Sequence, residues 1–200
     1  MKKKIVVFAS GNGSNFINIF EHLNRGFLDA KIILLISNNP KCGAVDFAKK
    51  NQINYKIIND FRYPELKNKN KEYEFVLQYY KTDLILLAGF MKKIPKNIVD
   101  IYKDRIMNIH PSLLPKFGGK GFYGMKVHNA AIKSNEKNSG ATVHLVNGEY
   151  DKGKVIIQEK VKINASDTAE TLASKVLKIE HQIYPKAIEI FFSDNFKTQQ

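Results

Sequence analysis

The chain carries, just past its midpoint, the stretch Asn108-Ile109-His110-Pro111-Ser112-Leu113-Leu114-Pro115. Residues 105–109 are predicted to form a strand, and the two prolines stop it and restrict the loop that follows. Side chains two residues apart share a face of a strand, so Asn108 and His110 point the same way. An amide that donates hydrogen bonds and an imidazole that titrates near neutrality suit oxyanion stabilisation and proton transfer. This pairing is typical of acyl transfer.

The segments around this stretch alternate between strand and helix patterns. Short runs that are apolar throughout are predicted as buried strands, and segments with apolar residues at helical spacing separate them. The predicted strands are residues 5–9, 32–36, 55–58, 84–88 and 105–109. Fully apolar strands joined by helices predict an α/β fold, with a Rossmann-like, mostly parallel sheet covered on both faces.

The pattern changes after residue 140. Residues 141–146 and 155–162 read as strands joined by a turn without a helix, which predicts an antiparallel addition to the sheet. Residues 168–192 predict a long C-terminal helix, which Pro185 should kink or divide. Residues 61–71 are expected to be a polar loop. With no linker or repeat, residues 1–200 are expected to form a single domain.

Composition narrows the class of protein. The chain has 200 residues, 44% of them hydrophobic, and a formal net charge of +13 at pH 7. One cysteine, Cys42, excludes an internal disulfide framework and a multi-cysteine zinc site. The scattered lysines favour a generic basic surface that attracts anionic small molecules, with a nucleic-acid surface as the alternative. The apolar run at residues 5–9 is too short for a signal peptide or a membrane span, which predicts a cytoplasmic enzyme.

The loop at residues 10–15, Ser-Gly-Asn-Gly-Ser-Asn, is a candidate phosphate site. Its glycines let backbone N–H groups converge, and the helix that follows, with Ser14 or Asn15 as its expected cap, offers its positive end. The third glycine of a dinucleotide fingerprint is missing at Phe16, and the loop lacks the Gly-Lys-Ser/Thr of a P-loop. A phosphate monoester fits best, and an ordinary tight turn is the alternative.

Two acidic positions are further candidates. Asp151 lies in the turn between the two antiparallel strands, where it is either a turn acid or a partner that raises the pKa of His110. Glu180, in the last helix, reads on its own as part of a solvated face. The remaining histidines (His22, His128, His144 and His181) show no metal-ligand spacing, so no metal is expected.

Taken in order, residues 11–15, 88–92 and 108–115 with Asp151 resemble the folate-dependent phosphoribosylglycinamide formyltransferases of purine synthesis. The resemblance runs from Lys4 to about Phe192. It implies formyl transfer from 10-formyltetrahydrofolate to the amine of 5'-phosphoribosylglycinamide, without a metal or a covalent intermediate. The implied partners are these small molecules, with no nucleic acid and no membrane, and the implied state is a monomer or weak homodimer.

The resemblance also implies roles for individual residues. Asn108, His110 and Asp151 match the catalytic trio, with His110 as an imidazolium, kept charged by Asp151, that holds the oxyanion. The ribonucleotide is implied to contact Gly13, Ser14 and Asn15 through its phosphate and Glu180 through its ribose. The implied folate-binding residues are Met91, Lys92, Ile94, Asn108, Asn147 and Asp151.

The chain departs from the family pattern in three places: residues 61–71 offer no clean counterpart of a folate-contacting arginine, Lys92 replaces an arginine, and the loop at 117–124 differs. Two related enzymes are rivals. Methionyl-tRNA formyltransferase carries a further C-terminal domain, and formyltetrahydrofolate deformylase carries an extra N-terminal one. A non-catalytic basic module that binds nucleotides or RNA is a rival from another class.

Overall fold

The computed structural model describes residues 2–26 and 28–193. The chain divides into two compact units, Met1–Met107 and Asn108–Gln200, and each is described by itself. The organisation of residues 1–200 as a single domain stays a prediction. None of the helices within the described ranges has the length and apolar character needed to cross a membrane.

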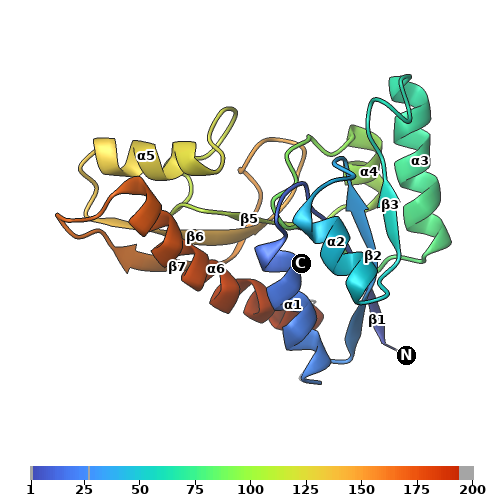
Figure 1. Ribbon diagram of the computed structural model, residues 1–200, viewed down its shortest axis with the longest axis horizontal. Coiled ribbons are helices and arrows are strands. Elements are labelled where there is room, and N and C mark those ends of the chain that lie inside the picture. The colour runs from blue at the N-terminus through green and yellow to red at the C-terminus, as the bar shows by residue number, and fades with distance from the viewer. Residues whose placement is uncertain (1, 27, 194–200) are drawn as a thin grey trace. The chain divides into compact units, whose positions relative to one another are not determined.

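The first unit is built on parallel strands. Its elements are β1 (Lys3–Phe8), α1 (Ser14–Asn24), β2 (Ala30–Ser37), α2 (Gly43–Lys50), β3 (Tyr55–Ile57), α3 (Leu66–Tyr79), β4 (Leu84–Leu87) and α4 (Lys96–Ile101) (Figure 1). β1 pairs in parallel with both β2 and β4, and β2 pairs in parallel with β3. The predicted parallel sheet is therefore confirmed, and its strands end at one common edge.

Helices cover both faces of these strands. The side chains of residues 5–8 in β1 are fully buried, as expected for a strand that is apolar on both sides. On one face, α1 and α2 pack together, with Phe16 edge-on to Phe47 at 5.4 Å between ring centroids. On the other, Tyr73 of α3 stacks on Phe8 at 5.8 Å, and α3 contacts α4. The general preference for right-handed crossovers leads to this division, because the strand order runs outward from β1 to β3 and then returns to β4.

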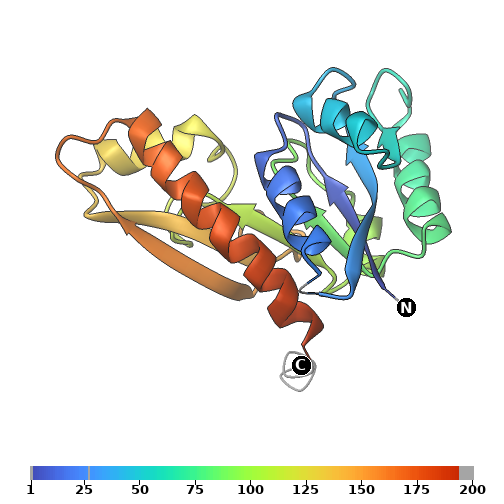
Figure 2. The same cartoon turned by 60° about the horizontal axis from the view of Figure 1, so that its bottom comes forward.

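The second unit contains the antiparallel addition. β5 (Ile106–His110) crosses the boundary between the units, and α5 (Met125–Lys133), β6 (Asn138–Leu145), β7 (Val155–Lys162) and α6 (Ala169–Phe192) follow. β6 and β7 pair antiparallel, with Ser139 opposite Val161, and α6 lies across both strands (Figure 2). The strand order of the sheet is β3-β2-β1-β4-β5-β6-β7. The α/β, Rossmann-like fold with its antiparallel strand addition is therefore confirmed.

Three local predictions were wrong. The helix α3 begins at Leu66 inside the predicted loop, because its first turns are exposed and rich in Lys and Asn, which hides the helical period. α1 is preceded by Gly13 in the left-handed conformation, φ 77°, and neither Ser14 nor Asn15 caps it. Of the kink or division predicted at Pro185, the division is wrong: α6 runs unbroken from Ala169 to Phe192 and buries Pro185 with its neighbours.

We expect Gly140→Ala to destabilise the second unit, because β7 approaches β6 closely at this position. A Cβ on Gly140 would lie 2.1 Å from the carbonyl oxygen of Glu159 and 2.7 Å from Cδ2 of Leu113. Overpacking of this kind costs about 1–3 kcal/mol of unfolding free energy, measurable by chemical denaturation. Gly11→Ala is the control, since its Cβ would meet no atom within 4 Å. Equal losses in both variants would contradict this account.

Candidate active site

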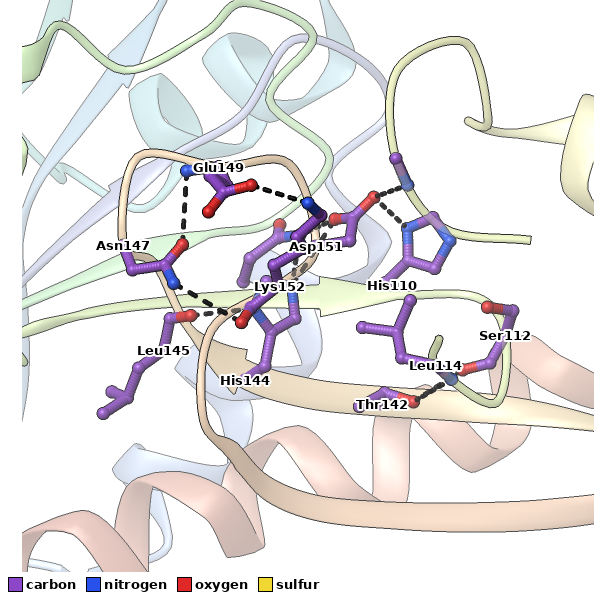
Figure 3. Close-up of polar contacts among 12 residues, drawn as sticks. His110, Ser112, Leu114, Thr142, His144, Leu145, Asn147, Glu149, Asp151 and Lys152 are labelled. Atoms are coloured by element: carbon purple, nitrogen blue, oxygen red, sulfur yellow. Dashed lines mark hydrogen bonds and ion pairs between the residues drawn. The ribbon is translucent and has the colours of Figure 1, made fainter. Parts of the chain in front are cut away.

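The carboxylate of Asp151 is the centre of a cluster of polar side chains in the second unit. Asp151 sits in the loop between β6 and β7, in a left-handed conformation with φ 56°. Its Oδ2 accepts the backbone N–H of Gly119 at 2.8 Å and lies 3.5 Å from Nδ1 of His110. Its Oδ1 lies 3.5 Å from Nε2 of His144 and accepts from Nδ2 of Asn108 at 3.4 Å (Figure 3). The predicted trio of Asn108, His110 and Asp151 is therefore brought together.

His110 is held in one orientation by its loop. Nε2 lies 2.8 Å from the carbonyl oxygen of Phe117. A carbonyl can only accept, so Nε2 carries the hydrogen, and a neutral ring has its lone pair on Nδ1. That lone pair faces Oδ2 of Asp151. The imidazole therefore presents its basic nitrogen to the carboxylate, where a proton taken up at Nδ1 meets a negative charge.

Thr142 of β6 fixes the loop that carries Phe117. Its Oγ1 donates to the carbonyl of Ser112 at 2.6 Å and accepts the backbone N–H of Leu114 at 3.2 Å. Gln158 of β7 donates to the same Oγ1 at 2.8 Å. One fully buried hydroxyl thus ties the loop after β5 to two strands, and sets the position of the carbonyl that orients His110.

His144 is the site residue that the sequence prediction missed. Its Nδ1 lies 2.8 Å from the carbonyl of Leu145, and its Nε2 lies 3.2 Å from Nδ2 of Asn108. In the neutral tautomer that donates from Nδ1, Nε2 accepts from the amide, and Asp151 favours this amide orientation because the opposite one would place oxygen against oxygen. Thr142 and His144 are buried polar residues two apart on one strand. That is the same signal that identified Asn108 and His110.

The charge state of His110 differs from the prediction. Burial lowers the pKa of its imidazole, and although Asp151 and the Phe117 carbonyl act to raise it, the pKa stays below its ordinary value of 6.5. In the ligand-free protein the ring is therefore neutral at pH 7, whereas the sequence predicts an imidazolium that holds the oxyanion. For Asp151, burial raises the pKa, but His144, His110 and the Gly119 N–H outweigh it, so the carboxyl is ionised at neutral pH.

The candidate phosphate loop lies in the first unit. Gly13 accepts the backbone N–H of Ile17 at 2.8 Å as α1 begins, and Gly11 accepts that of Ala44 at 3.1 Å. A Cβ on Gly13 would lie 2.8 Å from Cβ of Ala44, so the first turn of α2 packs directly against this loop. Ser14 is half-buried and Asn15 is buried. The packing against α2 explains why glycine is needed at position 13.

The predicted folate-binding residues lie in two loops. In the first unit, Met91 and Lys92 are exposed after β4 while Ile94 is buried; the backbone N–H of Met91 donates to Oγ of Ser10 at 2.9 Å. In the second unit, the side chain of Asn147 closes the loop that carries Asp151, accepting the backbone N–H of Glu149 at 3.2 Å.

The predicted ribose-binding Glu180 is half-buried in α6. In the part of the chain that the structure describes, no group of three or more His, Cys, Asp or Glu side chains is arranged to hold a metal.

We expect the ring nitrogens of His110 to titrate below pH 6.5 in the free protein, and Asp151→Asn to lower that pKa further. The substitution removes the negative charge that favours the imidazolium and leaves the desolvation in place. Nitrogen-15 NMR of the labelled imidazole, followed from pH 8 to pH 5, measures both values. A pKa of His110 above 6.5 in the wild type would contradict the burial argument.

The chain matches a protein-family model. Residues 3–188 match the family described as formyl transferase, which is almost the whole chain.

Two relatives show the extent of the match. The chloroplastic phosphoribosylglycinamide formyltransferase of Arabidopsis thaliana is 40% identical over 200 residues, covering all of this chain and 68% of that protein. The phosphoribosylglycinamide formyltransferase of Bacillus subtilis is 34% identical over 197 residues, covering 94% of this chain and 93% of that protein. The match to B. subtilis is thus close to end to end for both proteins.

Solved structures of proteins with these names have the same fold as this chain. The crystal structure of phosphoribosylglycinamide formyltransferase from Bacillus halodurans superposes with a TM-score of 0.88 at 34% identity, covering 96% of this chain and 97% of that one. A formyltetrahydrofolate deformylase from Pseudomonas syringae has a TM-score of 0.83 over 94% of this chain and 60% of that one, but at 24% identity it shows the fold alone. The chain therefore belongs to the phosphoribosylglycinamide formyltransferase family of formyl transferases.

Proposed function

We propose that this protein transfers the formyl group of 10-formyltetrahydrofolate to the amine of 5'-phosphoribosylglycinamide, a step of purine biosynthesis. The observation that carries the proposal is the cluster of Asn108, His110 and His144 around the Asp151 carboxylate. It occurs in a chain whose relatives over its full length are named for this reaction. Folate is a co-substrate, and no metal takes part in the proposed chemistry.

The proton chemistry follows from the neutral state of His110. The substrate amine attacks the formyl carbon, giving a tetrahedral intermediate with a negative oxygen and a positive nitrogen. That nitrogen loses a proton, through a water ordered beside Asp151, to the lone pair on Nδ1 of His110, and Asp151 stabilises the imidazolium as it forms. The imidazolium then returns the proton to N10 of the departing folate. Asp151 thus acts on a charge that appears only during the reaction.

Asn108 is the proposed donor to the oxyanion. Both hydrogens of its amide are engaged in the free protein, one by Nε2 of His144 and one by Oδ1 of Asp151. The bond to Asp151 is the longer, at 3.4 Å against 3.2 Å, so it is the one to be exchanged for the oxyanion. His144 keeps the amide plane fixed during this exchange. Donors that are oriented in advance stabilise an oxyanion most effectively.

The loops of the first unit supply the proposed binding contacts. Ser14 and Asn15 begin α1 directly after Gly13, where the backbone N–H groups of the first helical turn and the helix dipole favour a phosphate. Residues 91–94 follow β4 and are proposed to bind the folate, with Asn147 and Glu180 of the second unit contacting folate and ribose respectively. The net charge of +13 suits two anionic substrates. Cytoplasmic location, a monomeric or weakly dimeric state and the lack of a nucleic-acid partner remain predictions; the Arabidopsis relative is chloroplastic.

We expect His110→Ala, Asn108→Ala and Asp151→Asn each to lower kcat by about a hundredfold or more, the usual scale for an acid–base group or oxyanion donor. The assay follows folate absorbance with 10-formyltetrahydrofolate and 5'-phosphoribosylglycinamide. Glu136→Gln, which removes the charge of a half-buried carboxylate paired with Lys116 in the same unit, is the matched control and should keep full activity. Wild-type turnover in His110→Ala would exclude the mechanism.

We expect Ser14→Asp to raise the KM for the ribonucleotide strongly, because it places a negative charge in the proposed phosphate site. The KM for folate should change little. Asn24→Asp adds the same charge at the other end of α1 and serves as the control. Steady-state kinetics with each substrate varied in turn give both constants. Equal rises in the two KM values would show that the phosphate does not bind at this loop.

A further inference from the structure

The hydroxyl of Ser10 joins two segments that the proposed function assigns to different substrates. Ser10 follows β1 and opens the candidate phosphate loop, and only 8% of its surface is exposed. Its Oγ donates to Oδ1 of Asn38 at 2.5 Å and accepts the backbone N–H of Met91 at 2.9 Å. Its backbone N–H donates to the carbonyl of Gly89 at 3.1 Å. The hydroxyl therefore donates its one hydrogen to Asn38, in the loop after β2, and accepts with one lone pair from Met91, in the loop after β4.

Asparagines extend this connection to the ends of the other parallel strands. Asn39 donates from Nδ2 to the carbonyl of Ser10 at 3.4 Å, and Asn59, which follows β3, donates from Nδ2 to the carbonyl of Asn38 at 3.1 Å. Ser10, Asn38, Asn39 and Asn59, here called the strand-end network, thus link the loops after β1, β2 and β3. Through Met91, the network also holds the loop after β4.

The segment after β4 is held at a second point. Nζ of Lys92 lies 3.7 Å from Oδ2 of Asp60, the residue next to Asn59. This ion pair is exposed and therefore weak, whereas the bond from Met91 to Ser10 is made by a nearly buried hydroxyl. The Met91 peptide is thus held mainly by Ser10, and Asn38, Asn39 and Gly89 hold Ser10 at the start of the loop that continues into Gly13.

We propose that Ser10 is a positioning residue that couples the two substrate sites: a phosphate bound at residues 13–15 steadies Ser10, and Ser10 steadies the Met91 peptide for the folate. The inference rests on the proposed function for the identity of the two ligands. Ordering that is shared between two sites makes the second ligand bind more tightly once the first is bound, and the effect is reciprocal. Ser10 touches neither reacting group, so its removal acts on binding more than on chemistry.

Two measurements on the full chain test the coupling. The first is amide hydrogen exchange at Met91 by NMR, without ligands. Ser10→Ala should speed this exchange about five- to tenfold, the usual effect of losing one neutral hydrogen bond. Ser10→Thr keeps the hydroxyl and should restore slow exchange. Thr82→Val, which deletes a buried hydroxyl bonded to the carbonyl of Leu77 in the same unit, should leave it unchanged.

The second measurement is the affinity for tetrahydrofolate by calorimetry, with and without saturating 5'-phosphoribosylglycinamide. The ribonucleotide should tighten folate binding severalfold in the wild type, Ser10→Thr and Thr82→Val, and have almost no effect in Ser10→Ala. The same tightening in Ser10→Ala, or unchanged exchange at Met91, would overturn the coupling alone. A wild type that binds neither ligand would overturn the coupling and the proposed function together.

Discussion

The chemistry of this protein depends on an ionised carboxylate that is largely removed from water. Asp151 receives the Gly119 N–H and the Asn108 amide, and it faces the rings of His110 and His144. Burying a carboxylate is costly unless hydrogen-bond donors compensate for the lost water. The pKa of Asp151 lies below its ordinary value, so here the compensation exceeds the cost. The carboxylate thereby orders the side chains around it and remains available to stabilise a new positive charge.

A neutral His110 beside this carboxylate is suited to accept a proton. Burial keeps the imidazole uncharged at neutral pH, and the Phe117 carbonyl fixes its hydrogen on Nε2. The position of that carbonyl depends in turn on Thr142, which binds Ser112 and Leu114 in the loop after β5. The base is therefore oriented by contacts from the neighbouring strand. It gains its proton only when a positive nitrogen forms, which is when Asp151 contributes most.

The sequence predicted those features that depend on local patterns. Fully apolar runs identified β1, β2 and β4, and the same-face spacing of Asn108 and His110 identified the strand end that carries the catalytic groups. Contacts between distant residues were harder to predict. The expectation that His110 lies beside Asp151 rested on the family resemblance. His144 was missed because only the apolar residues of its strand were considered. The lowered pKa of His110 in the free protein was not predicted, since attraction to Asp151 can be inferred from a sequence and the opposing desolvation cannot. The start of α3 was hidden by its polar surface.

The most direct test of the central claim follows where the formyl group goes. Purified protein is given 10-formyltetrahydrofolate with a carbon-13 label in the formyl group, together with equal concentrations of 5'-phosphoribosylglycinamide and methionyl-tRNA, and the products are followed by carbon-13 NMR. The account predicts that nearly all the label appears as the formamide of the glycinamide ribonucleotide. Label that accumulates instead as formate, or on methionyl-tRNA, would contradict it.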